Sequence, residues 1–139
     1  MNAIVITGAS SGIGRALALR AARAGLCVVG VGRDATRLAQ LVDEAGSTSR
    51  IHTMAADVGD SGAAKRIVAF ALEKCGMIDV LVNNAGEAAV GALVAQSDES
   101  LRRQFSTHVM GPIALVREAL PALRAVRGHV IMLGSGVAR

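Results

Sequence analysis

The octapeptide Thr7-Gly8-Ala9-Ser10-Ser11-Gly12-Ile13-Gly14 constrains this chain more than any other stretch. It follows an apolar run, residues 3–6, and opens into a segment with helical periodicity. This order predicts a strand, a tight turn and a helix N-terminus, whose free N–H groups and dipole favour an anion such as a dinucleotide pyrophosphate. Glycine at positions 8, 12 and 14 lets the turn form and lets a phosphate approach the backbone. We therefore predict a dinucleotide-binding turn rather than a purely structural one.

Apolar runs alternate with helical stripes along the rest of the chain. Strands are predicted over residues 2–7, 26–32, 50–56, 78–83 and 129–133. Helices are predicted between them: one over residues 12–24, a second capped by Asp34 and closed by Gly46, a third capped by Asp60 or Ser61 and closed by Gly76, and a long one that starts at Ser97 and is kinked at Gly111-Pro112. Such alternation with short connections predicts an α/β fold, with a parallel sheet covered on both faces.

Composition limits the classes of protein to which the chain can belong. The net charge of +4 is spread along the helices, and the only aromatic residues are two phenylalanines, so a nucleic-acid surface is not expected. No apolar run reaches membrane-spanning length, and neither a signal peptide nor a metal site is expected. Cys27 and Cys75, which form no C-x-x-C motif, are expected to be buried free thiols. The sequence thus predicts a cytoplasmic protein that binds neither nucleic acid nor membranes.

Five motifs in sequence order resemble the short-chain dehydrogenase/reductase family. They are the T-G-A-S-S-G-I-G octapeptide, Asp57-Val58, the N-N-A-G motif of residues 83–86, Gly111-Pro112, and G-H-V-I-M-L-G-S at residues 128–135. The resemblance implies a Rossmann-like, doubly wound parallel sheet of five strands in the order 3-2-1-4-5, within a truncated three-layer sandwich. It also implies that residues 1–139 are one NAD(P)-binding domain without the C-terminal part of the family fold, and that the protein is a homo-oligomer.

The same resemblance implies the residues that hold the cofactor. The octapeptide would bind the diphosphate and ribose, Asp57 would accept from the adenine amino group, and the N-N-A-G loop would line the adenosine ribose. The alternative for Asp57 is a cap at the helix entry, for which Asp60 is better placed. The expected cofactor contacts are Gly8, Ser10, Ser11, Gly12, Ile13, Gly14, Arg33, Asp57, Val58, Asn84, Ala85 and Gly86.

The end of the second predicted strand bears on the choice between NADP and NAD. In the family pattern the position of the NAD-selecting acid falls on Gly32, and Arg33 occupies the position that contacts a 2′-phosphate. Asp34 can be argued to be a ribose-binding acid, but its place at a helix start favours an N-cap. We therefore expect NADP(H), with NAD(H) as the alternative.

The catalytic residues of the family match this chain only in part. Ser135 matches the serine that orients the substrate carbonyl, and His108 stands where the family has asparagine. His108 is either a proton-relay residue or a half-buried histidine without a catalytic part. The Tyr-x-x-x-Lys pair has no counterpart, because the sequence contains no tyrosine.

Two hypotheses follow from the missing pair. In the first, these residues are the N-terminal part of a reductase or dehydrogenase that acts on a small carbonyl or alcohol substrate, which the sequence does not identify. In the second, the chain is a catalytically silent nucleotide-binding or interaction module. Under both, the 139 residues alone are expected to be inactive, and the fifth strand is expected to leave an open sheet edge that promotes association.

Overall fold

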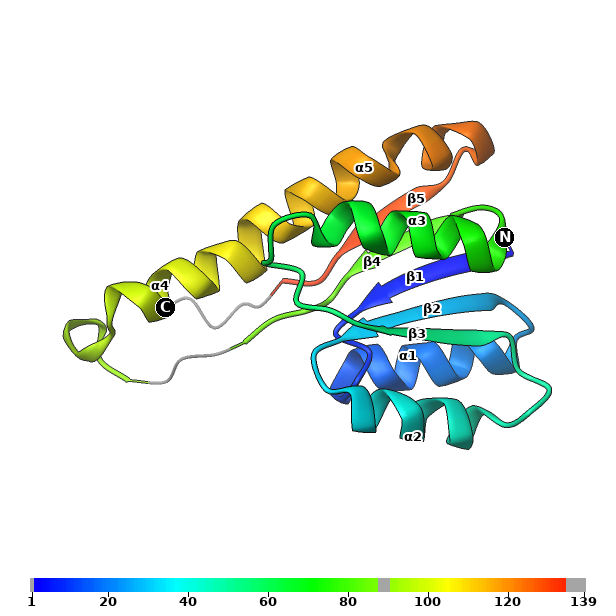
Figure 1. The fold of residues 1–139 in the computed structure, drawn as a ribbon, viewed down its shortest axis with the longest axis horizontal. Helices are drawn as coiled ribbons and strands as arrows, with labels where there is room; N and C mark the ends of the chain where they lie inside the picture. The colour runs from blue at the N-terminus through cyan, green and yellow to red at the C-terminus, as the bar shows by residue number, and fades with distance from the viewer. Residues whose placement is uncertain (1, 88–90, 135–139) are drawn as a thin grey trace.

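The computed structural model describes residues 2–87 and 91–134, which form a five-stranded parallel sheet with helices on both faces (Figure 1). The strands are β1 (Ala3–Thr7), β2 (Cys27–Gly32), β3 (Ile51–Ala55), β4 (Val80–Asn83) and β5 (His129–Met132). Their order is β3-β2-β1-β4-β5, and every neighbouring pair is parallel. The predicted α/β class and the predicted order 3-2-1-4-5 are confirmed.

Two pairs of helices enclose the sheet because its apolar residues alternate between the faces. Helices α1 (Gly12–Arg23) and α2 (Ala35–Ala45) pack against one face, where Ile4, Ile6 and Val28 lie. On the other face, Val5 and Val29 pack against α3 (Ala63–Cys75) and α5 (Gly111–Val126). The remaining elements are a short 3₁₀ turn (Leu93–Ala95), α4 (Asp98–Phe105) and a π-helical segment (Ser106–Met110). In Figure 1, α4 projects beyond the carboxyl ends of the strands.

Of the three predicted side-chain caps, two are confirmed and one is wrong. Asp34 caps α2 by accepting a 3.0 Å hydrogen bond from the Arg37 N–H, and Ser97 caps α4 in the same way. Neither Asp60 nor Ser61 caps α3, whose N-cap is Gly62 in the left-handed conformation with φ 75°. Successive backbone turns from Asp57 to Asp60 and from Asp60 to Ala63 bring the chain to the helix, so the start needs no side-chain cap.

The long helix is interrupted next to the predicted kink site at Gly111-Pro112. The five residues before Gly111 form the π-helical segment, and Pro112 lies in the first turn of α5. Proline suits that position because the first N–H groups of a helix have no intrahelical partner. The helical run therefore divides into α4, which lies outside the sheet, and α5, which covers it.

The expectation of two free thiols is wrong, because Cys27 and Cys75 form a disulfide. β2 begins at Cys27 and α3 ends at Cys75, and in a parallel α/β unit strand starts and helix ends lie at the same edge of the sheet. The two Cα atoms are 5.8 Å apart although 48 residues separate them in sequence. The bond ties β2 to α3 at the edge opposite the carboxyl ends of the strands.

The last strand and the long helix leave apolar surface exposed. All four residues of β5 are exposed, and in the described residues β5 pairs only with β4. Phe105, Met110 and Ile113 on the helical run are also more than half exposed. None of the helices in residues 2–87 and 91–134 combines the length and the apolar character that crossing a membrane requires.

Candidate functional site

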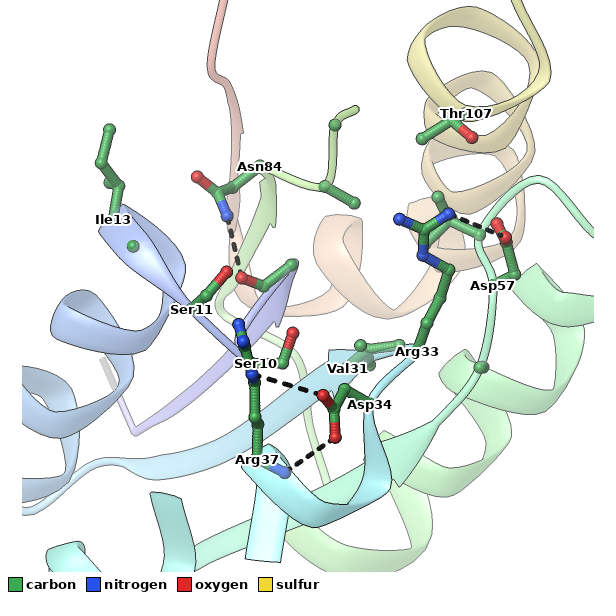
Figure 2. Close-up of a pocket in the computed structure, with 17 residues that line it drawn as sticks. Ser10, Ser11, Ile13, Val31, Arg33, Asp34, Arg37, Asp57, Asn84 and Thr107 are labelled. Carbon is green, nitrogen blue, oxygen red and sulfur yellow. Dashed lines mark hydrogen bonds and ion pairs between the residues drawn. The ribbon is translucent and has the colours of Figure 1, made fainter. Parts of the chain in front are cut away.

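A cavity of about 460 Å³ opens at the carboxyl ends of the strands (Figure 2). It lies beside β1, because β2 and β3 are added on one side of that strand and β4 and β5 on the other. The crevice at such a switch in strand order is the usual ligand site of an open α/β sheet. Its lining comes from the glycine turn, the tips of β2 and β3, the loop after β4, and the π-helical segment. The lining residues are Gly8, Ser10, Ser11, Gly12, Ile13, Val31, Gly32, Arg33, Asp34, Arg37, Ala56, Asp57, Val58, Asn84, Ala85, Gly86 and Thr107.

All the predicted cofactor residues except Gly14 line this cavity. Gly14 instead packs behind the turn, where a Cβ would collide with the Gly8 carbonyl oxygen and the Asn84 side-chain nitrogen. Gly8 has φ 70°, and a Cβ there would lie 2.9 Å from the Ala85 Cα. The turn and the loop after β4 are thus pressed together, which explains why these two positions need glycine.

The N-terminus of α1 faces this cavity from the glycine turn. Its N-cap, Ser11, is extended, and within the described chain its side chain makes no capping hydrogen bond. The first N–H groups of α1 are therefore not satisfied by a side-chain cap and are oriented toward the cavity side of the turn. With the helix dipole, they make this end of the cavity favourable for an anion.

Thr7, the first residue of the octapeptide, has a role that was not predicted for it: it fixes the loop after β4. Its hydroxyl accepts 3.0 Å hydrogen bonds from the backbone N–H groups of Asn84 and Ala85, and lies 3.3 Å from the Val82 carbonyl oxygen. The Asn84 amide returns a 2.8 Å hydrogen bond to the Thr7 carbonyl. The sequence did contain a signal for this role: a threonine at the end of an apolar strand. Such a residue is buried, and a buried hydroxyl needs hydrogen-bond partners.

Two arginines line the cavity on either side of the α2 start. Arg33 follows β2, and Arg37, which the sequence analysis missed, lies in the first turn of α2. The Asp34 carboxylate caps α2 and also lies 3.3 Å from Arg37 Nε, so it is already engaged within its own helix. In the view of Figure 2, Asp34 lies between the two arginines.

The tip of β3 forms the far wall of the cavity. One oxygen of Asp57 accepts a 2.9 Å hydrogen bond from the Gly59 N–H, and the other lies 3.8 Å from Arg33 Nη1. Thr107 of the π-helical segment lines the same wall, and its buried hydroxyl has no hydrogen-bond partner among the described residues. Asp57 therefore holds its own turn and retains one oxygen toward the cavity.

Glu87, also missed from the sequence, joins two arginines at the edge of the site. Its carboxylate accepts a 3.0 Å hydrogen bond from Arg33 Nη1 and a 2.9 Å hydrogen bond from Arg103 Nε. The hydrogen bond from Arg103, together with that from Arg33, lowers the pKa of Glu87 despite its partial burial. The carboxylate is therefore ionised at neutral pH.

The two candidate catalytic residues are not both described. Ser135 lies outside the described residues. His108 does not line the cavity; its Nε2 lies 2.7 Å from the Glu87 carbonyl oxygen and 3.2 Å from the Glu87 backbone nitrogen. Its observed contact is thus with the loop after β4. No cluster of three or more His, Cys, Asp or Glu suited to a metal ion occurs in residues 2–87 and 91–134.

Comparison with known proteins places this architecture in a family. The model of the short chain dehydrogenase family matches residues 2–139. Dehydrogenase/reductase SDR family member 7B of Bos taurus is 37% identical over 140 residues, covering 95% of this chain and 43% of that protein.

Two solved structures show the same likeness in three dimensions. A metagenomic short-chain oxidoreductase in complex with NADP has a TM-score of 0.91 at 30% identity, covering 99% of this chain and 64% of that one. A short-chain dehydrogenase/reductase from Burkholderia phymatum in complex with NAD has a TM-score of 0.91 at 31% identity, covering 96% and 49%. The chain spans about half the length of such relatives. With its sheet order, its glycine turn and a family match over nearly all its residues, this chain belongs to the short-chain dehydrogenase/reductase family.

Proposed function

We propose that this chain binds NADP(H) and forms the cofactor-binding part of an oxidoreductase that interconverts a small carbonyl compound and an alcohol. The observation that supports this most is the single cavity that joins the α1 N-terminus, Arg33 and the Asn84–Gly86 loop. Its chemistry suits the parts of a dinucleotide in turn: an anion at the glycine turn, a ribose beside the loop, and an adenine toward Asp57.

The glycine turn would hold the diphosphate. The open face at Gly12, where a Cβ would meet nothing within 4 Å, leaves room for a phosphate, and the uncapped N–H groups of α1 would donate to it. The side chains of Ser10 and Ser11 line the same end of the cavity. The residues present therefore fit the group that the family implies.

Adenosine recognition would fall to the opposite wall. The Asp57 oxygen that does not accept from the Gly59 N–H would be an acceptor for an exocyclic amino group, and Val58 offers apolar contact beside it. Asn84, Ala85 and Gly86 would pack along the ribose, held in place by Thr7. The fold brings Asp57 and Asn84 to one cavity although they are 27 positions apart in the sequence.

The preference for NADP(H) rests on the two arginines. A guanidinium binds a phosphate through paired, charge-assisted hydrogen bonds, and Arg33 and Arg37 both reach the cavity. The one carboxylate at the β2 tip, that of Asp34, is engaged as the α2 cap and would not serve the ribose hydroxyl. NAD(H) remains the alternative cofactor, since relatives of similar likeness are known with either.

Catalysis would need residues beyond those described. When bound, the nicotinamide would supply or accept the hydride. By family resemblance Ser135 would orient the carbonyl, and a Tyr-x-x-x-Lys pair, for which this sequence has no tyrosine, would donate the proton. His108, whose ring contacts the Glu87 backbone, would position the loop after β4, and a role in a proton relay is proposed only for the complete enzyme. The second candidate function is a nucleotide-binding module without catalysis.

The exposed apolar surface supports self-association. Phe105, Met110 and Ile113 on the helical run and the whole of β5 are available for contact with a second copy or with a complementing segment. Sedimentation at tens of micromolar checks this proposal. A clean monomer would contradict it.

Calorimetric titration of the chain with NADP⁺ and with NAD⁺ tests the cofactor proposal. We expect tighter binding of NADP⁺, and a loss of about tenfold in its affinity in Arg33→Gln, since a hydrogen bond to a charged group contributes about 1.5 kcal/mol. Arg23→Gln, at the far end of α1, is the matched control with the same change of charge. Failure of both dinucleotides to bind would overturn the proposal.

A further inference from the structure

Glu87 is an acidic residue in a place where an NADP-binding site would be expected to be basic. Its side chain is 17% exposed, and each carboxylate oxygen accepts from a different arginine. Arg33, the residue proposed to bind the 2′-phosphate, is one of these two donors. Its guanidinium is therefore already paired before any ligand arrives.

The position of Glu87 is built into the fold. The residue directly follows the loop that Thr7 anchors, and its backbone lies against the His108 ring. Arg103 of α4 donates to the second oxygen, which keeps the carboxylate in place even when Arg33 moves away. A 2′-phosphate on Arg33 would thus lie near a fixed negative charge.

We infer that Glu87 is a specificity-determining residue whose carboxylate competes with the 2′-phosphate of NADP(H) for Arg33. This inference rests on the proposed function, since it presupposes that Arg33 contacts the 2′-phosphate. To bind the phosphate, Arg33 has to exchange a 3.0 Å hydrogen bond with a carboxylate for hydrogen bonds with the ligand. NAD(H), which has a hydroxyl in place of that phosphate, does not require this exchange. Glu87 therefore narrows the difference in affinity between the two cofactors.

The alternative to competition is that Glu87 orients the Arg33 side chain so that it can bind the 2′-phosphate. Two observations favour competition. Glu87 and Asp57 together place two carboxylates within 4 Å of Arg33 Nη1, so an incoming dianion meets like charge as well as the guanidinium. Arg33 is also more than half exposed, so its side chain is free to leave Glu87 for a ligand.

The test compares two ligands that differ only in the 2′-phosphate: adenosine 2′,5′-bisphosphate and adenosine 5′-monophosphate. Their dissociation constants are measured by calorimetry on the chain, on Glu87→Gln and on Glu73→Gln. Glu73 is the matched control, because it too pairs with a cation, Lys74 at 2.6 Å, but on the last turns of α3. The ratio of the two affinities reports the 2′-phosphate alone.

We expect Glu87→Gln to raise the ratio in favour of the bisphosphate about two- to fivefold, the range of an exposed ion pair, and Glu73→Gln to leave it unchanged. In the Arg33→Gln background, Glu87→Gln should raise the ratio by less, because no guanidinium is left for which the carboxylate and the phosphate compete. A ratio that stays the same or falls in Glu87→Gln would overturn the inference.

The outcomes separate the inference from the proposed function. If neither ligand binds the wild-type chain, the cofactor proposal fails and the inference fails with it. If both bind and Arg33→Gln lowers the ratio while Glu87→Gln does not raise it, the cofactor proposal stands and only the competition is refuted. Circular dichroism of each variant confirms that the comparison is made between folded chains.

Discussion

β2 and β5 are both short, apolar, parallel strands of one sheet, yet their surroundings are opposite. All six residues of β2 are buried, whereas all four residues of β5 are exposed. β2 pairs with β1 and β3 and packs against α1, α2 and α3, while in the described residues β5 pairs with β4 alone. An apolar run thus predicts a strand. Whether its side chains are buried depends on the strands and helices that pack around it. We call the part of the sheet around β1, β2 and β3, whose strands are covered by helices, the enclosed half of the fold. The cavity lies at the carboxyl ends of these strands.

The largest expected effect on stability comes from breaking the disulfide in the enclosed half of the fold. Reduction of the Cys27–Cys75 bond should lower the free energy of unfolding by about 3–4 kcal/mol, because the unfolded chain regains the freedom of a long closed loop. Urea unfolding with and without reductant measures this. The double variant Cys27→Ala/Cys75→Ala is the control and should not respond to reductant. Two titratable thiols in the native, untreated chain would refute the bond.

A matched valine pair compares the two strands directly. Val29→Ala in β2 should cost about 2–3 kcal/mol, since the side chain is fully buried and its loss leaves a cavity. Val130→Ala in β5, where the side chain is 41% exposed, should cost less than about 1 kcal/mol. Both values come from urea unfolding curves. Equal costs would mean that β5 is covered in solution. If a second copy covers it, the loss of stability in Val130→Ala should depend on protein concentration.

A matched threonine pair tests whether the hydrogen bonds of Thr7 stabilise the loop that lines the cavity. Thr7→Val removes the acceptor of two backbone N–H groups and should cost about 2 kcal/mol. Thr107→Val should be close to neutral, since the Thr107 hydroxyl has no hydrogen-bond partner in the described chain. Thermal unfolding of both variants gives the difference. A cost at Thr107 similar to that at Thr7 would show that its hydroxyl has a partner in solution.

A smaller effect is expected where β1 joins β4. Asp79 Oδ2 accepts 2.8 Å hydrogen bonds from the N–H groups of Asn2 and Ala3. These bonds, led by that from Asn2, lower the pKa of Asp79 below the ordinary value of an aspartate despite partial burial. A lowered pKa in the folded state means that the stabilisation is present above the unfolded value and is lost as pH falls through the folded value. Asp79→Asn should therefore cost about 1 kcal/mol at pH 7.

The pH dependence of that cost is the decisive measurement. Urea unfolding of wild type and Asp79→Asn should give curves that converge in strong acid, where Asp79 is protonated in both states. Asp98→Asn is the control, because Asp98 is an exposed residue of α4 whose contact with Arg102 spans 3.8 Å. A cost at Asp79 that does not change with pH would show that the carboxylate charge is not involved.

Local signals in the sequence were enough to predict the elements of the enclosed half of the fold. The glycine turn, the Asp34 cap and the alternation of strands and helices each depend on residues close in sequence, and the strand order was implied by the family motifs. The disulfide, the Gly62 start of α3 and the Arg33–Glu87–Arg103 contacts were not foreseen. Each depends on groups that only the folded backbone brings together, or on turn geometry that no single side chain determines.

The candidate site divides in the same way. Residues of the glycine turn and the loop after β4 were predicted, because family motifs mark both. Arg37 and Thr107 were not, since an arginine in a first helical turn and a threonine inside a helix are ordinary in any sequence. Their relevance comes only from the cavity they share.

The π-helical segment Ser106–Met110 has a consequence for how the length of this chain can vary. A π turn accommodates one more residue than an α turn while the helix on either side keeps its direction. Deleting one residue there should thus leave an uninterrupted α-helix with α4 and α5 still in phase. A deletion elsewhere in the same run would rotate everything beyond it by about 100°, one residue's share of a 3.6-residue turn. The helix would survive the first change, but the His108 ring would lose its place against Glu87. This segment is therefore a point at which a one-residue deletion alters the site and spares the scaffold.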